Sequence, residues 1–144
     1  MTGQLPLFSL KPTPIDTIVK ESNVTGSSVF LMIETKESIH NIDEIAAVKG
    51  VDVLLIGSND LAIELGVPGQ FRSPEFRSAL ERVSRACVTH KKILGLAGIY
   101  GNIEIHDWAV NTLGARFILG QQDSGILVRA GKEVVDSLSK IATT

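Results

Sequence analysis

The sequence has little of several features that mark common classes of protein. Cysteine occurs once, at Cys87, so no disulfide can form within the chain and a reducing, cytoplasmic setting is expected. Aromatic residues make up 5% of the chain, which predicts an aliphatic core. The 14 lysines and arginines are outnumbered by 16 acidic residues, so the net charge of −2 provides no basic excess for binding nucleic acid.

Long apolar runs are also missing. Val51–Gly57 and Ile93–Tyr100 are among the longest, and both are far shorter than the roughly 20 residues that a membrane-spanning helix needs. Met1–Leu10 lacks the basic start and apolar centre of a secretory signal, so neither export nor a membrane partner is expected. With 144 residues, of which 44% are hydrophobic, the chain has enough apolar material for one packed domain.

Four short apolar runs follow residue 28 and alternate with helical patterns. The runs are Val29–Glu34, Asp52–Ile56, Ile93–Ala97 and Ala115–Leu119. Because polar and apolar side chains do not alternate within them, they predict strands buried on both faces of a parallel sheet. Helices are predicted at residues 38–47, 61–65, 74–90, 103–113 and 123–141. Residues 1–28 are predicted to be a linker with one short helix near Ile15–Glu21, and residues 29–144 the α/β domain.

Two architectures fit this order of parallel βα units. One is a small open α/β sheet, and the other is half of a (β/α)₈ barrel, whose usual length is about 250 residues. Composition and periodicity do not separate them. The chain has no G-x-G-x-x-G or G-x-x-x-x-G-K-[ST] motif, so a nucleotide site has no specific support.

Two carboxylates stand where consecutive predicted strands end. Glu34 and Asp60 would lie at one edge of a parallel sheet, with neighbouring strands about 4.8 Å apart. Carboxylates there repel unless a proton or cation lies between them, and their oxygens suit Mg²⁺ or Mn²⁺. The alternative is that both cap the helices that follow, and the spacing alone slightly favours capping. The backbone amides of residues 57–60 could also bind a carboxylate or phosphate.

The other reactive side chains are less suited to chemistry. His40, His90 and His106 are predicted to lie on helices, at the surface and away from the strand ends. Cys87 falls in the long helix predicted at residues 74–90, where a buried thiol acts as a small apolar side chain. The sequence therefore identifies no general base.

Several longer strings resemble the HpcH/HpaI aldolase (citrate lyase-like) family. They are MIETKE at residues 32–37, IDEIAAVKGVD at residues 42–52, and IGSNDLA with LG at residues 56–62 and 65–66. The pattern continues at Leu113, Gly114, Phe117, Gly120, Asp123, Leu127 and Ala130. The resemblance covers about residues 29–141, and it shifts the preference for Glu34 and Asp60 from capping to metal binding.

This resemblance implies the C-terminal half of a (β/α)₈ barrel, about its fifth to eighth strands. It implies a metal-dependent aldolase that cleaves or forms 4-hydroxy-2-keto acids through a pyruvate enolate, with Mg²⁺ or Mn²⁺ held by Glu34 and Asp60. Pyruvate or oxaloacetate and an aldehyde would be the partners. The implied substrate-binding residues are Gly57, Ser58, Asn59, Asp60 and Ala97.

The sequence departs from the family in ways that leave other functions open. Ser58 replaces a usual proline and Ala62 a usual serine, and the family's N-terminal half, with its histidine base and arginine, has no counterpart. The chain is therefore expected to form a homo-oligomer or to pair with the missing half. The alternative is a catalytically silent half-barrel that assembles with another chain. A third possibility, an open-sheet protein that binds a small ligand, has no residues specifically in its favour.

Overall fold

The computed structural model describes residues 13–141, except for the side chains of residues 25 and 26. The part of the predicted linker at residues 1–12 lies outside the described residues. The strands are β1 (Phe30–Ile33), β2 (Val53–Gly57), β3 (Ile93–Ala97) and β4 (Phe117–Ile118). The helices are α1 (Ile15–Glu21), α2 (Lys36–His40), α3 (Ile42–Ala47), α4 (Ser58–Glu64), α5 (Pro74–His90), α6 (Ile103–Asp107) and α7 (Asp123–Leu138). Single π-helical turns follow α1 and α6, at Ser22–Gly26 and Trp108–Thr112.

The strands form a parallel sheet in the order β1-β2-β3-β4, as their apolar sequences predict. Ile33 pairs with Ile56, and Gly57 pairs with Ala97, so the carboxyl ends of the first three strands are level. Pairing continues beyond the two residues of β4, because Arg116 and Leu119 also donate backbone hydrogen bonds to β3. The sheet thus brings all four strand ends to one edge.

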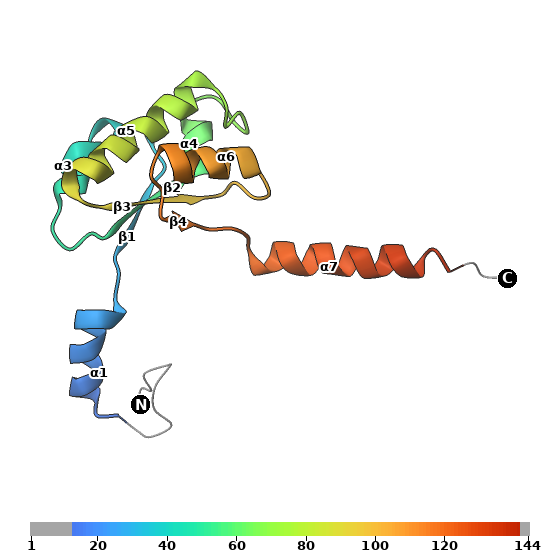
Figure 1. Cartoon of the computed structure of the whole chain (residues 1–144), viewed down its shortest axis with the longest axis horizontal. Coiled ribbons are helices and arrows are strands. Elements are labelled where there is room, and N and C mark those ends of the chain that lie inside the picture. Colours follow the sequence, from blue (N-terminus) through green and yellow to red (C-terminus); the bar gives the residue numbers. More distant parts are fainter. Residues whose placement is uncertain (1–12, 142–144) are drawn as a thin grey trace.

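Helices α3, α4, α5 and α6 cover one face of the sheet (Figure 1). The buried core beneath them is aliphatic apart from Cys87 and Phe76, the second of which is fully buried. Helix α5 begins where Ser73 and Pro74 predict, and the Ser73 hydroxyl accepts a hydrogen bond from the Phe76 amide at 3.2 Å. Cys87 is 2% exposed, and burial raises the pKa of its thiol to about 11.

The opposite face of the sheet is concave. Phe30 on β1 and Phe117 on β4 lie on the two outer strands, yet their ring centroids are 5.0 Å apart. The outer strands of a flat four-stranded sheet would lie about 14 Å apart, so the sheet curls until these rings meet. Gly95 makes room for this contact, because a Cβ there would lie 2.8 Å from Leu55 Cδ1 and 3.3 Å from Phe117 Cδ1.

The prediction of one continuous helix over residues 38–47 is wrong, because the helix breaks at Asn41. Asn41 has φ −96° and ψ 17°, and its backbone amide still bonds the Glu37 carbonyl. The carbonyl of His40 accepts a hydrogen bond from the Arg82 guanidinium on α5 instead, at 2.8 Å. A long-range contact therefore compensates for the interrupted helix. The helix predicted at residues 103–113 widens into its π-helical turn and ends at Gly114, whose φ is +76°.

The first and last helices bury none of their residues. Helix α1 forms where the short helix was expected, and both α1 and α7 project away from the sheet and its helices (Figure 1). No helix in the described part of the chain has the length and apolarity needed to cross a membrane.

Candidate functional site at the strand ends

Neither Glu34 nor Asp60 caps a helix. Helix capping, the alternative to metal binding that the sequence leaves open for these two residues, is therefore wrong. Thr35 caps α2, where its hydroxyl accepts a hydrogen bond from the Ser38 amide at 3.0 Å. Asp60 lies in the first turn of α4, whose N-cap, Gly57, has no side chain to bond. Within residues 13–141, no hydrogen bond or ion pair holds the Glu34 or Asp60 carboxylate.

The Glu34 carboxylate lies against the end of the neighbouring strand. Because Ile33 pairs with Ile56, Glu34 is level with Gly57. A Cβ on Gly57 would lie 2.9 Å from Glu34 Oε2 and 3.1 Å from its Cβ. A side chain at residue 57 would therefore displace the Glu34 carboxylate, so glycine here allows that carboxylate to lie against the end of β2, which α4 and Asp60 directly follow.

A pocket of about 230 Å³ lies at this edge of the sheet. The lining includes all the residues that the family resemblance names for substrate binding, which are Gly57, Ser58, Asn59, Asp60 and Ala97. Glu34 is not among the lining residues, but it contacts Gly57, which is. The fold thus gathers the predicted residues around one pocket, while the roles assigned to them stay predictions.

A side-chain hydrogen bond joins the first turn of α4 to the loop after β3. The Asn59 side chain donates to the Gly98 carbonyl at 3.0 Å, which links the end of β3 to the start of α4. Gly98 has φ +88°, and a Cβ there would lie 3.5 Å from the backbone nitrogens of both Ser58 and Asn59. The missing side chain therefore keeps space open beside those two amides.

The Ser58 hydroxyl is the buried polar group of this site that lacks a partner. Ser58 is 0% exposed, and its Oγ forms no hydrogen bond with any described residue. A buried hydroxyl without a partner costs about 1–3 kcal/mol, so such groups commonly belong to sites where a ligand or water completes the bonding.

Half of the pocket lining was given no role in the site from the sequence. These residues are Met32, Gly98, Tyr100, Leu119 and Gln122. Position after a strand was the available signal, since Gly98 directly follows β3 and Gln122 lies in the loop after β4. Tyr100 could not be chosen this way, because it stands three residues beyond Ala97 and reaches the pocket only through the turn of its loop.

The histidines do not line the pocket. His40 is exposed at the end of α2, and His90 lies 3.9 Å from Asp43 at the far end of α5. The surface role expected for His106 is wrong, because its half-buried ring contacts the Ile99 carbonyl at 2.9 Å. It therefore holds the loop after β3.

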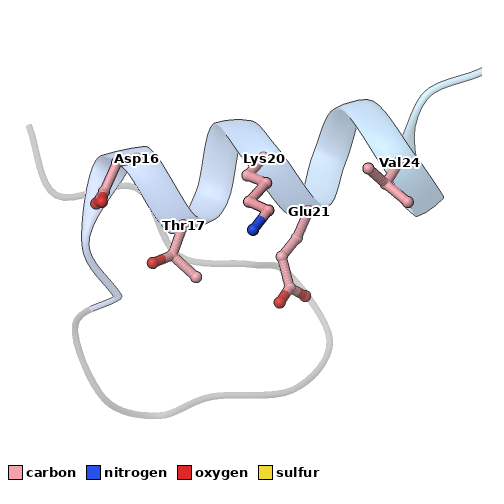
Figure 2. A pocket seen from close by; sticks show the side chains of 5 residues that line it. All are labelled: Asp16, Thr17, Lys20, Glu21 and Val24. Carbon is pink, nitrogen blue, oxygen red and sulfur yellow. The ribbon is translucent and has the colours of Figure 1, made fainter.

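A larger hollow of about 470 Å³ lies along α1 (Figure 2), a helix that lies apart from the sheet (Figure 1). Its described lining is Asp16, Thr17, Lys20, Glu21 and Val24 (Figure 2). These side chains come from one helix and the turn after it, and none is a residue that the sequence singles out. The strand-end pocket is therefore the candidate functional site, although both this hollow and another of about 540 Å³ along α2 and α3 are larger.

Comparison with known proteins places similar sequences among aldolases. Residues 15–112 match the family HpcH/HpaI aldolase/citrate lyase. The chain is 50% identical to the 4-hydroxy-4-methyl-2-oxoglutarate aldolase of Chaetomium globosum and 48% identical to that of Hapsidospora irregularis, over 98% of its length. Each alignment covers 52% of the relative, so the chain spans about half the length of these curated relatives.

The fold is also shared with a solved aldolase. The crystal structure of an HpcH/HpaI aldolase from Desulfitobacterium hafniense matches with a TM-score of 0.74 and 28% sequence identity. The match covers 92% of this chain and 50% of that one. The structural match is thus limited to about half of the known protein, as the sequence matches are.

Proposed function

Because this chain belongs to the HpcH/HpaI aldolase/citrate lyase family, we propose that it is the metal- and substrate-binding half of a divalent-metal-dependent aldolase. The reaction is the cleavage or formation of a 4-hydroxy-2-keto acid, with pyruvate and a second carbonyl compound as the cleavage products. The observation that carries the proposal is the pair of uncommitted carboxylates, Glu34 and Asp60, at adjacent strand ends beside one pocket.

The residues present fit a hard divalent ion. Glu34 and Asp60 offer carboxylate oxygens that no described residue engages, and such oxygens suit Mg²⁺ or Mn²⁺. No group of three or more His, Cys, Asp or Glu that could hold a metal occurs among residues 13–141, so water and substrate would complete the coordination. When bound, the ion supplies a Lewis acid for the negative charge that develops on the keto oxygen.

The chain's own backbone would bind the keto acid's carboxylate. The amides of Ser58, Asn59 and Asp60 begin α4, where the first amides of a helix have no intrahelical acceptor. Gly98 leaves space beside two of these amides, and the Asn59 side chain holds the loops in register. The unpartnered Ser58 hydroxyl is a further donor close by. Together these groups can orient a 2-keto acid.

The curled sheet supports the proposal that the chain is half of a (β/α)₈ barrel. Phe30 and Phe117 meet as side chains do inside such a barrel, while β1 and β4 each leave one edge unpaired within the described residues. No histidine, lysine or arginine lines the described pocket. We therefore assign the general base and a cationic substrate-binding group to a second half of the barrel. We also place the reaction in the reducing cytoplasm that the single cysteine suggests.

Metal binding provides the direct test. Glu34→Gln and Asp60→Asn should each weaken Mn²⁺ binding at least tenfold, which corresponds to about 1.4 kcal/mol, as measured by calorimetric titration. Glu37→Gln is the matched control, because it removes the same charge from an exposed residue of α2. Unchanged Mn²⁺ affinity in both site variants would remove the metal site from the proposal.

A second assay distinguishes an active enzyme from a catalytically silent half-barrel. The silent half-barrel is the alternative that the lack of a base in the described pocket favours. A positioned base contributes roughly 10²–10⁴-fold to a rate, so the chain alone should cleave 4-hydroxy-2-keto acids poorly. Oxaloacetate decarboxylation with Mn²⁺ should survive, since it needs no proton abstraction from an alcohol. If a supplied N-terminal half-barrel restored no aldol cleavage, the silent half-barrel would be the better description.

A further inference from the structure

Two polar side chains of the strand-end pocket have no part in the proposed binding of metal and keto acid. Tyr100 and Gln122 line the pocket together with Asp60 and Ala97. Across residues 13–141, nothing bonds the Tyr100 hydroxyl or the Gln122 side-chain amide. Both groups are therefore available to a ligand in this pocket.

The loop that carries Tyr100 is held from several directions. The preceding Gly98 carbonyl accepts the hydrogen bond from Asn59, and the Ile99 carbonyl contacts the His106 ring at 2.9 Å. The Ile99 side chain is 3% exposed and packs in the core. Since this backbone is already held, little backbone conformational entropy remains to be lost when the phenol binds a ligand.

Gln122 is likewise not engaged by its own helix. It occupies the N-cap position of α7, but its side chain forms no capping hydrogen bond. Its backbone amide instead donates to the Gln121 side-chain oxygen at 2.9 Å. The Gln122 amide group therefore remains a donor and acceptor at the rim of the pocket.

The residues of the pocket come from the ends of all four strands. The proposed metal ligands follow β1 and β2, whereas Tyr100 follows β3 and Gln122 follows β4. Asp60, Tyr100 and Gln122 line the same pocket, so a keto acid bound at Glu34 and Asp60 would have its remaining carbons within reach of Tyr100 and Gln122. These two are the hydrogen-bonding side chains of the described lining beyond the β2 loop.

We propose that Tyr100 and Gln122 bind the polar group at the far end of the substrate and select keto acids that carry a second carboxylate. This inference rests on the proposed function, because it assumes that the keto-acid end lies at Glu34 and Asp60. A phenol and an amide are neutral donors, so they can bind a carboxylate without adding a second positive centre beside the metal.

Two stable keto acids test the proposal. Pyruvate and 2-oxoglutarate share the 2-keto-acid end, but only 2-oxoglutarate has a distal carboxylate, and neither has the 4-hydroxyl group that cleavage needs. Calorimetry at saturating Mg²⁺ gives both dissociation constants for the full chain. Tighter binding of 2-oxoglutarate is expected, and Tyr100→Phe and Gln122→Leu should each lower its advantage over pyruvate about tenfold, the effect of one hydrogen bond to a charged group.

The affinity ratio makes the test independent of general damage to the fold. Gln70→Leu, at an exposed glutamine in the loop before α5, is the matched control and should leave the ratio unchanged. An unchanged ratio in both site variants, or equal binding of the two ligands by the unaltered chain, would overturn the roles of Tyr100 and Gln122 alone. Failure of the unaltered chain to bind either keto acid with Mg²⁺ would overturn the proposed function as well.

Discussion

Helices α5 and α7 are nearly equal in length and both carry an apolar stripe, but only α5 is packed. Of the 17 residues of α5, seven are buried against the sheet and α3, whereas α7 has 16 residues and buries none. Figure 1 shows α5 lying across the sheet and α7 extending away from it. The comparison teaches that an amphipathic sequence specifies a helix face, while burial depends on a surface to receive that face.

The unpacked helix exposes large apolar side chains. On and just beyond α7 these are Ile126, Leu127, Val128, Val134, Val135, Leu138 and Ile141. Contiguous exposed apolar patches are rare on monomeric proteins and commonly mark an interface. Together with the unpaired edges of β1 and β4, they support the expectation that this chain associates with another.

Substitutions on α5 and α7 should differ most in their effect on the free energy of unfolding. Leu80 on α5 is 0% exposed, so Leu80→Ala should lower the free energy of unfolding by about 2–5 kcal/mol. Leu127 on α7 is 71% exposed, and Leu127→Ala should change it by no more than about 0.5 kcal/mol. Urea denaturation at low protein concentration measures both. Equal losses would mean that α7 is packed in solution.

At pH 8, a cysteine on α7 should be alkylated at least about a hundredfold faster than Cys87 on α5. The raised pKa of Cys87, about 11 against an ordinary 9.0, leaves roughly one hundredth of the usual thiolate, and burial slows its alkylation further. A Val128→Cys variant places a thiol where the side chain is 72% exposed. Time-resolved alkylation followed by mass spectrometry should label residue 128 first. Protection of residue 128 would show that α7 is covered.

Folding should also depend on pH through Cys87. Its pKa is higher in the folded chain, so the unfolded chain loses the thiol proton first as pH rises. Stability should therefore fall between about pH 9 and pH 11, and Cys87→Ala should reduce this decline relative to neutral pH. Denaturation midpoints across that range provide the measurement, and an identical decline in the variant would assign it to other groups.

Single substitutions should have their smallest effect on association, because many exposed apolar side chains contribute to it. Light scattering should give a mass above that of the 15.5 kDa monomer at micromolar concentration. Leu127→Lys should shift the association to higher concentration, whereas Lys132→Gln on the same helix should not. A stable, cooperatively folding monomer throughout this range would contradict the expectation.

Much of the fold could be predicted from local sequence. The aliphatic runs marked all four strands, and Ser73 with Pro74 located the start of α5, because these signals act within a few residues. The break at Asn41 could not be predicted, since the Arg82 guanidinium that compensates for it lies 42 residues beyond His40, whose carbonyl accepts its hydrogen bond. Strand β4, predicted at residues 115–119, has two residues in the structure, and Arg116 and Leu119 on either side of them also donate backbone hydrogen bonds to β3.

The candidate site divides in the same way. Residues next to strand ends, such as Asp60 and Ala97, could be chosen because parallel strands end at one edge of a sheet. Tyr100 and the role of His106 could not, because both depend on how a loop folds back over the sheet. The capping alternative for Glu34 and Asp60 was decided only by the geometry of Thr35 and Gly57.

By itself, the sequence determined the order of βα units, the parallel sheet and the strand-end position of Glu34 and Asp60. These depend on side-chain polarity and on contacts between near neighbours in the chain. Only the tertiary structure decided that the carboxylates have no partner among residues 13–141, that Phe30 meets Phe117 across a curled sheet, and that α5 is buried while α7 is not. These three features depend on contacts between segments that are far apart in the sequence. The pattern of polar and apolar residues along the chain does not specify those contacts.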